Sequence, residues 1–184
     1  MTDFERITET NFSYPQPWWL PEQGFLFLHT RYDAGRRGLH TMTSRDGRRW
    51  SEPQPLVNIA KDDYQISWPT GKGRLGTAFD HHPPPLGLNA RANIYYLETN
   101  DGRATWTTAA GDKVVIPLNE SQNLALVLDS VSEGKLVYLK DLTFDSQGHP
   151  VILFCLVTSI CGLILAQVIS QANDTTQLGS FQTL

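Results

Sequence analysis

Phenol, guanidinium and imidazole groups, with one amide, gather near the ends of short apolar stretches in this sequence. Tyr and His side chains can accept or donate a proton, and Arg is a permanently charged partner for a carboxylate. Such a set suits acid–base chemistry on a substrate that carries a carboxylate. The residues are Tyr14, Arg31, Tyr64, His81, His82, Asn89 and Arg91. They can act together only if the backbone brings them to one place.

The apolar stretches predict a chain built mainly of β-strands. Each is extended or alternates apolar and polar residues, and Gly- or Pro-containing turns separate one from the next. The stretches are residues 12–20, 25–32, 39–43, 51–57, 64–68, 73–79, 93–99, 135–144 and 149–157.

Two similar turns mark a repeat. Residues 44–50 and 99–106 each contain an Asp-Gly pair and close on a tryptophan, Trp50 or Trp106. The tryptophans are 56 residues apart, a period that suits one four-stranded propeller blade with long loops. We therefore predict an all-β fold, a partial β-propeller of about two and a half four-stranded antiparallel blades.

Strand order in such a blade places the reactive groups. The first strand lines the central channel, and its start lies on the same rim as the end of the second strand. The seven residues above should converge on this rim, away from the two tryptophan turns, and His29 should share the face of Arg31 because it is two residues away. For Tyr14 the alternative is a packed aromatic ring, and for Arg31 a surface salt bridge. His81 and His82 should point to opposite faces, so we expect His82 to contact a sugar rather than form a metal pair.

The quoted stretches resemble a known family. Both turns resemble the Asp-box of sialidase-like propellers, and the segments YPQPWW, HTRY, GTAFDHHP and NIYYLET resemble the BNR-repeat family that includes the ulvan lyases. The resemblance implies a polysaccharide lyase that cleaves uronic-acid polysaccharide by β-elimination, with Tyr14 as the catalytic tyrosine and Arg31 as the neutralising arginine. It also implies a histidine from an earlier blade, absent here, so the isolated chain is expected to be inactive. Such families are usually secreted or periplasmic, but residues 1–9 lack signal-peptide features.

Two other functions stay open, a sialidase-like glycoside hydrolase and a non-catalytic glycan-binding or structural repeat. The substrate-binding residues that we expect under the leading interpretation are His29, Tyr64, His82, Asn89 and Arg91. An acidic polysaccharide is the expected partner, and the net charge of −4 argues against nucleic acid. We expect no cofactor, and a structural metal stays open.

The end of the sequence breaks the pattern. We assign residues 1–154 to the partial propeller and residues 155–184 to an apolar segment and polar tail that cannot be recognised as part of the fold. A buried strand followed by a helix, a membrane span over residues 151–172, and sequence foreign to the fold are the alternatives. We favour a strand followed by foreign sequence and do not expect a membrane partner.

Overall fold

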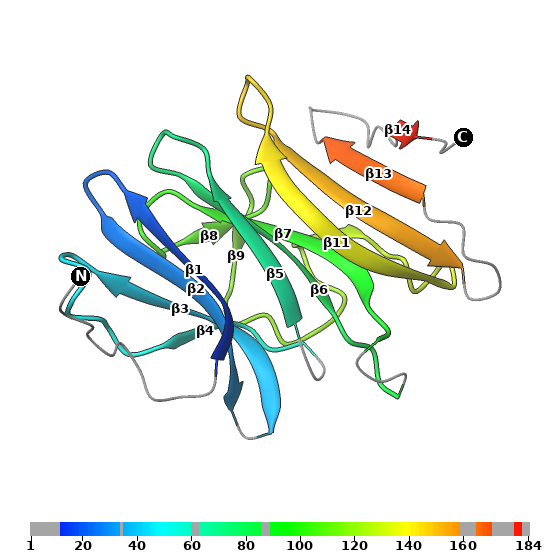
Figure 1. Cartoon of the computed structure of the whole chain (residues 1–184), viewed down its shortest axis with the longest axis horizontal. Coiled ribbons are helices and arrows are strands. Elements are labelled where there is room, and N and C mark those ends of the chain that lie inside the picture. Colours follow the sequence, from blue (N-terminus) through cyan, green and yellow to red (C-terminus); the bar gives the residue numbers. More distant parts are fainter. Residues whose placement is uncertain are drawn as a thin grey trace, which may run out of the picture.

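The computed structural model describes residues 12–33, 35–59, 63–85, 89–158, 165–170 and 179–181. Within these ranges every regular element is a β-strand, and the strands form three antiparallel sheets that stand side by side (Figure 1). The first sheet, or first blade, consists of β1 (Phe12–Leu20), β2 (Gly24–Asp33), β3 (Arg36–Ser44) and β4 (Gln54–Val57). The second blade consists of β5 (Asp63–Pro69), β6 (Leu75–His81), β7 (Ala92–Thr99), β8 (Trp106–Thr107) and β9 (Lys113–Val114), with β10 (Leu126–Leu128) paired to β7. The third blade consists of β11 (Lys135–Phe144), β12 (Pro150–Thr158), β13 (Leu165–Ser170) and β14 (Gly179–Phe181).

The first strand of each blade is an edge strand. β1, β5 and β11 lie next to one another and rise in the same direction (Figure 1). This is the arrangement predicted for strands that line the channel of a propeller. The partial propeller predicted from the repeat is confirmed.

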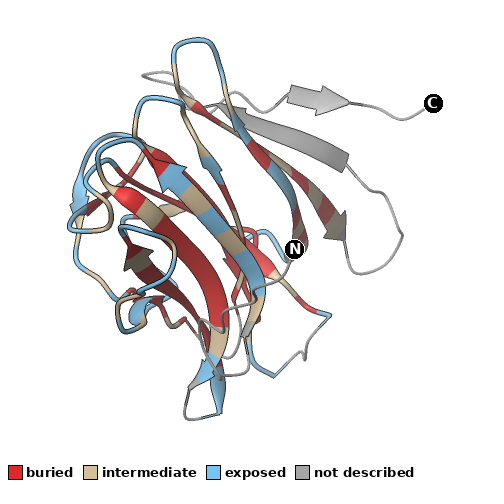
Figure 2. Ribbon diagram, turned by 60° about the vertical axis from the view of Figure 1, so that its left-hand side comes forward, coloured by how far each residue is buried: buried red, intermediate tan, exposed pale blue. Residues whose placement is uncertain are grey.

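Two apolar layers hold the blades together. One lies between the first and second blades around Leu28, Phe79 and Trp106, and the other lies between the second and third blades around Tyr96 and Phe154. Figure 2 shows the buried residues on the strands and the exposed residues mainly in the loops at the ends of the sheets. β6 and β7 of the second sheet are buried on both faces because this sheet has a blade on either side.

The Asp-containing turns follow β3 and β7, as predicted. In the first, Asp46 Oδ1 accepts hydrogen bonds of 2.9 Å from the backbone N–H groups of Arg48 and Arg49, and Gly47 has a φ of 74°. In the second, Asp101 Oδ1 accepts a 2.9 Å hydrogen bond from the N–H of Thr105. The hydrogen bonds and the backbone angle of Gly47 are those expected of tight turns between strands.

The end of the chain corrects one alternative. The apolar stretch 165–170, for which a helix was one interpretation, is the strand β13, so the helical interpretation is wrong there; β13 and β14 extend the third sheet. β12 runs without a break through the boundary predicted after residue 154 and buries Ile152, Phe154 and Leu156. Its apolar character reflects packing against the second blade. In the described ranges no helix is both long and apolar enough to cross a membrane.

Candidate functional site

Two tyrosines from neighbouring blades meet at the rim where β1 and β5 begin. The rings of Tyr14 and Tyr64 contact each other edge to face, with centres 4.8 Å apart. Tyr14 is 39% exposed, and its φ of 54° lies in the left-handed region that residues with a side chain rarely adopt. The amide of Gln65 donates a 3.2 Å hydrogen bond to the Tyr14 carbonyl oxygen. The second blade thus helps to hold a strained backbone that presents a phenol to solvent.

Two arginines surround the tyrosine pair. The guanidinium carbon of Arg91 lies 3.6 Å from the centre of the Tyr64 ring, and that of Arg37 lies 4.8 Å from the same point. Arg37 also lies 5.7 Å from the centre of the Tyr14 ring. Each such contact contributes about 0.5–2 kcal/mol. The rings therefore hold two guanidinium groups beside the two phenols.

The two phenols differ in acidity. Burial raises the pKa of Tyr14 to about 12, and the hydroxyl of Tyr64 adds to the rise. The hydrogen bond with Tyr14 lowers the pKa of Tyr64, and Arg37 and Arg91 act in the same direction, against the effect of burial. Tyr14 is therefore the phenol that stays protonated, and Tyr64 is the phenol closer to ionisation.

A buried carboxyl group completes the electrostatics. Asp80 on β6 pairs with Tyr64 in the sheet and is fully buried. Burial raises the pKa of Asp80 to about 7, although the charge of Arg91 and the backbone N–H groups of Leu139 and Tyr64 act to lower it. Near neutral pH Asp80 carries only part of a negative charge.

The structure brings several of the predicted site residues to this rim. His82 is buried, and its ring centre lies 5.2 Å from that of Tyr64. Asn89 reaches the rim through its backbone, because its carbonyl oxygen accepts a 2.8 Å hydrogen bond from the hydroxyl of Tyr138. The guanidinium of Arg91 lies 5.5 Å from the centre of the Tyr138 ring. Tyr14, Tyr64, His82 and Arg91 thus form one cluster, which we call the rim site, with Asn89 at its edge.

His29 and Arg31 lie on β2, on the face opposite to the core residue Leu28. His29 is fully buried, and its ring stacks on Phe27 with centres 4.7 Å apart. Burial lowers the pKa of His29 to about 4, with a smaller contribution from the charge of His40. A buried neutral histidine of this kind fits packing, so the sugar contact expected of His29 stays a prediction.

Arg31 pairs with Phe12 in the sheet and so lies at the same end of the blade as Tyr14. In the described part of the chain, however, the guanidinium groups that approach the Tyr14 ring are those of Arg37 and, acting by charge, Arg91. The neutralising role expected of Arg31 stays a prediction, and the guanidinium groups that lie over the tyrosine rings are those of Arg37 and Arg91.

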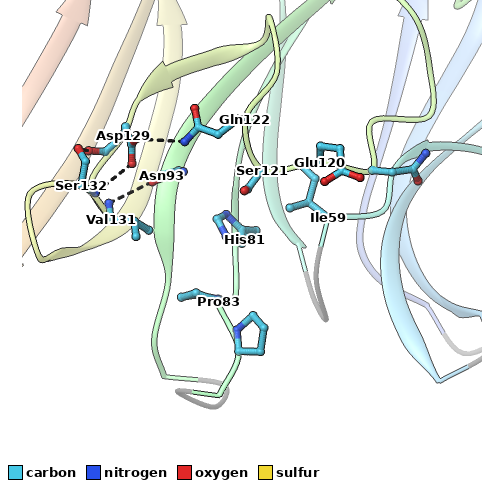
Figure 3. Close-up of a pocket in the computed structure, with 12 residues that line it drawn as sticks. Ile59, His81, Pro83, Asn93, Glu120, Ser121, Gln122, Asp129, Val131 and Ser132 are labelled. Carbon is cyan, nitrogen blue, oxygen red and sulfur yellow. Dashed lines mark hydrogen bonds between the residues drawn. The ribbon is translucent and has the colours of Figure 1, made fainter.

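His81 points away from His82, as strand alternation requires. It lines a cavity of about 540 Å³ with Asn93, Glu120 and Asp129 (Figure 3). Its Nδ1 lies 3.3 Å from the Tyr95 hydroxyl oxygen, and burial lowers the pKa of His81 to about 4. Within the described residues no three His, Cys, Asp or Glu side chains are arranged to hold a metal ion.

Three residues of the rim were not predicted from the sequence, Arg37, Asp80 and Tyr138. Tyr138 carried a usable signal, because each blade begins with a strand that contains a tyrosine near its start, at Tyr14, Tyr64 and Tyr138. Arg37 follows a turn and lies opposite Tyr32 in the hairpin, so only the register of β2 and β3 places it. Asp80 precedes the two histidines, but nothing in its sequence neighbourhood indicates its burial.

The fold and the rim site define a segment of a β-propeller whose three blades have four, six and four described strands. The sequence profile of the BNR repeat-containing family matches residues 1–160. The chain belongs to this family, and the resemblance to a BNR-repeat family that includes ulvan lyases is confirmed. No curated protein matches the sequence.

Solved structures agree with this assignment at the level of the fold. The chain is similar to a PL25 ulvan lyase bound to -[GlcA(1-4)Rha3S]-, with a TM-score of 0.72 and 15% identity over 92% of this chain and 43% of the other. It is also similar to the polysaccharide lyase Uly1, with a TM-score of 0.66 and 13% identity over 92% of this chain and 40% of the other. The chain thus spans about two fifths of the length of these enzymes.

Proposed function

We propose that this chain forms part of a polysaccharide lyase site that binds an acidic, uronate-containing polysaccharide at the rim site and supports β-elimination there. The observation that carries the proposal is the Tyr14–Tyr64 pair flanked by Arg37 and Arg91. The PL25 ulvan lyase with a similar fold is bound to -[GlcA(1-4)Rha3S]-, a saccharide that contains glucuronate and sulfated rhamnose. This likeness of fold supports the same class of ligand for this chain.

The geometry suggests a role for each group. A guanidinium beside the uronate carboxylate stabilises the negative charge that develops when the adjacent C5 proton leaves. Tyr64, whose pKa is lowered, is suited to accept that proton. Tyr14, which stays protonated, is suited to donate a proton to the departing O4 oxygen. The C5–H and C4–O bonds break, a C4–C5 double bond forms, and no water is consumed.

The proposal is tested by incubating the protein with polysaccharide built from alternating glucuronate and 3-sulfated rhamnose. The unsaturated uronate product absorbs in the ultraviolet, so its appearance can be followed directly. Any product that the wild-type chain forms should be lost in Tyr64→Phe and Tyr14→Phe and kept in Tyr32→Phe, an exposed tyrosine of β2 that serves as the control. Release of saturated sugar would instead indicate hydrolysis.

The chain spans less than half of the lyases, so binding is measured on the same samples by isothermal titration calorimetry. Binding without product would retain the rim site as a sugar-binding surface and reject elimination by this chain alone. Absence of both binding and product from a folded protein would reject the proposed function.

A further inference from the structure

A groove that adjoins the rim site crosses the three edge strands farther along their length. It has a volume of about 490 Å³ and is lined by Gln16, Trp18, Ser67, Trp68, Lys140 and Asp141, among others. Trp68 follows Tyr64 by four residues on β5, which is about 13 Å along a strand. Trp68, at the far end of the groove, is therefore more than one sugar ring away from Tyr64, whereas Pro15 and Ile66 lie at the end that adjoins the tyrosine pair.

Hydrogen bonds fix the aromatic wall of this groove. The indole N–H of Trp18 donates a 2.8 Å hydrogen bond to Ser67 Oγ. Ser67 in turn donates from its backbone N–H and its hydroxyl to Gln16 Oε1, at 2.7 and 2.5 Å. The Trp68 ring packs edge to face on Trp18 with centres 5.3 Å apart, yet Trp68 remains 47% exposed. A flat apolar surface is thus held in place and open to solvent. Its side chains lose little conformational freedom when a ligand binds.

Charged groups lie on the other side of the groove. Lys140 and Asp141 are both exposed, and the irregular pairing between Leu139 and Asp141 is the kind of bulge that redirects side chains. Asp141 Oδ1 accepts a 2.8 Å hydrogen bond from the backbone N–H of Leu142, which orients its carboxylate. The groove thus offers an aromatic plane, an exposed cation and a fixed acceptor for hydroxyl groups.

We propose that this groove is a second carbohydrate-binding site, which takes a pyranose ring of an acidic saccharide against Trp68 and pairs its anionic group with Lys140. The proposal deepens the proposed function and rests on it for the class of saccharide. An apolar ligand would not use Lys140, and a simple anion would not need the exposed indole plane. A ring with one apolar face, several hydroxyl groups and one negative charge uses all three features.

The test measures binding of a tetrasaccharide of glucuronate and 3-sulfated rhamnose to the full chain by calorimetry. We expect Trp68→Ala to weaken binding between about twofold and tenfold, with rescue by Trp68→Phe. Trp19→Ala is the matched control, because Trp19 is also exposed, at 56%, but contacts Phe25 on the other face of the first blade. Equal affinities of Trp68→Ala and Trp19→Ala would overturn the proposal.

The charge of Lys140 is tested in the same way. Lys140→Gln should weaken binding of the sulfated tetrasaccharide, whereas Lys113→Gln, an exposed lysine on β9, should not. A desulfated tetrasaccharide shows whether Lys140 contacts the sulfate or the carboxylate. If Lys140→Gln no longer weakens binding of the desulfated saccharide, the contact is to sulfate; if it still weakens binding, the contact is to the carboxylate. An unchanged affinity of Lys140→Gln for both saccharides would overturn the pairing.

Arg91→Ala distinguishes this groove from the rim site. If Arg91→Ala weakens binding and Trp68→Ala does not, the rim site stands and the groove proposal fails. If only Trp68→Ala weakens binding, the groove stands and the rim site fails as the binding surface. Circular dichroism and thermal unfolding of every variant verify that the fold is intact.

Discussion

Replacing Asp80 with asparagine should remove one component of the pH dependence of stability, the loss of stability as the pH rises through about 7. The folded pKa of about 7 lies above the ordinary value of 3.8 because the carboxyl group is buried. The folded chain therefore holds this proton more tightly than the unfolded chain does. The resulting stabilisation is fully present below pH 3.8 and is lost as the pH rises through about 7.

The size of the effect follows from that shift. Each unit of pKa difference corresponds to about 1.4 kcal/mol, so between about pH 5 and pH 8 the wild-type protein should lose roughly 3 kcal/mol through Asp80 alone. An asparagine side chain cannot ionise, so the variant Asp80→Asn lacks this loss. The free energy of unfolding of the variant, relative to wild type, should rise by roughly 3 kcal/mol from about pH 5 to pH 8.

The assay is urea unfolding followed by tryptophan fluorescence at a series of pH values. His29 and His81, with pKa values lowered to about 4, give the opposite slope, but they are present in both proteins and cancel in the difference. Asp112→Asn, at an exposed aspartate between β8 and β9, is the matched control. We compare the free energies of unfolding of Asp80→Asn and wild type at about pH 5 and about pH 8. If their difference is the same at both pH values, burial does not raise the pKa of Asp80.

Three further outcomes follow from contacts in the blades. Gly76→Ala should lower the free energy of unfolding by about 1–3 kcal/mol in a denaturation experiment, because the added Cβ would lie 2.7 Å from the Phe144 ring and meet the Tyr96 hydroxyl. An unchanged denaturation midpoint would contradict this packing. Phe154→Ala should lower the free energy of unfolding by about 3–5 kcal/mol in the same assay, because Phe154 is fully buried between the second and third blades. A decrease of less than about 1 kcal/mol would mean that β12 does not pack against the second blade. Arg91→Lys should bind acidic saccharide more weakly than wild type in calorimetry, because an ammonium group cannot stack on Tyr64 or form a bidentate contact, and full affinity would show that charge alone suffices.

Much of the fold could be predicted from local features. Alternating apolar residues predicted the main strands, and the Asp-Gly turns closed by Trp50 and Trp106 predicted the repeat and the order of strands. The end of the chain was harder to predict, because a long apolar run fits a helix, a membrane span or a strand buried by its neighbours. β12 shows the physical reason for that run, since one face packs on the second blade while the other stays half-buried.

The candidate site was predicted in part, for a similar reason. The order of strands within a blade was enough to bring Tyr14, Tyr64, His82 and Arg91 to one rim. It could not indicate that Arg37, across a hairpin, would be better placed than Arg31 to contact the phenols. That placement depends on the register of β2 and β3 and on the packing of one blade against the next, neither of which is encoded in a short motif.

The most direct test of the rim site is calorimetric titration of the chain with the tetrasaccharide of glucuronate and 3-sulfated rhamnose, comparing Arg91→Ala with Arg48→Ala. Arg48 is exposed in the turn after β3, at the opposite end of the sheets, and controls for loss of one positive charge. Loss of a charge-assisted contact of about 1.5–3 kcal/mol predicts that Arg91→Ala binds roughly 10- to 150-fold more weakly than wild type, while Arg48→Ala binds as wild type does. Equal affinity of the two variants would contradict the assignment of the acidic saccharide to this rim.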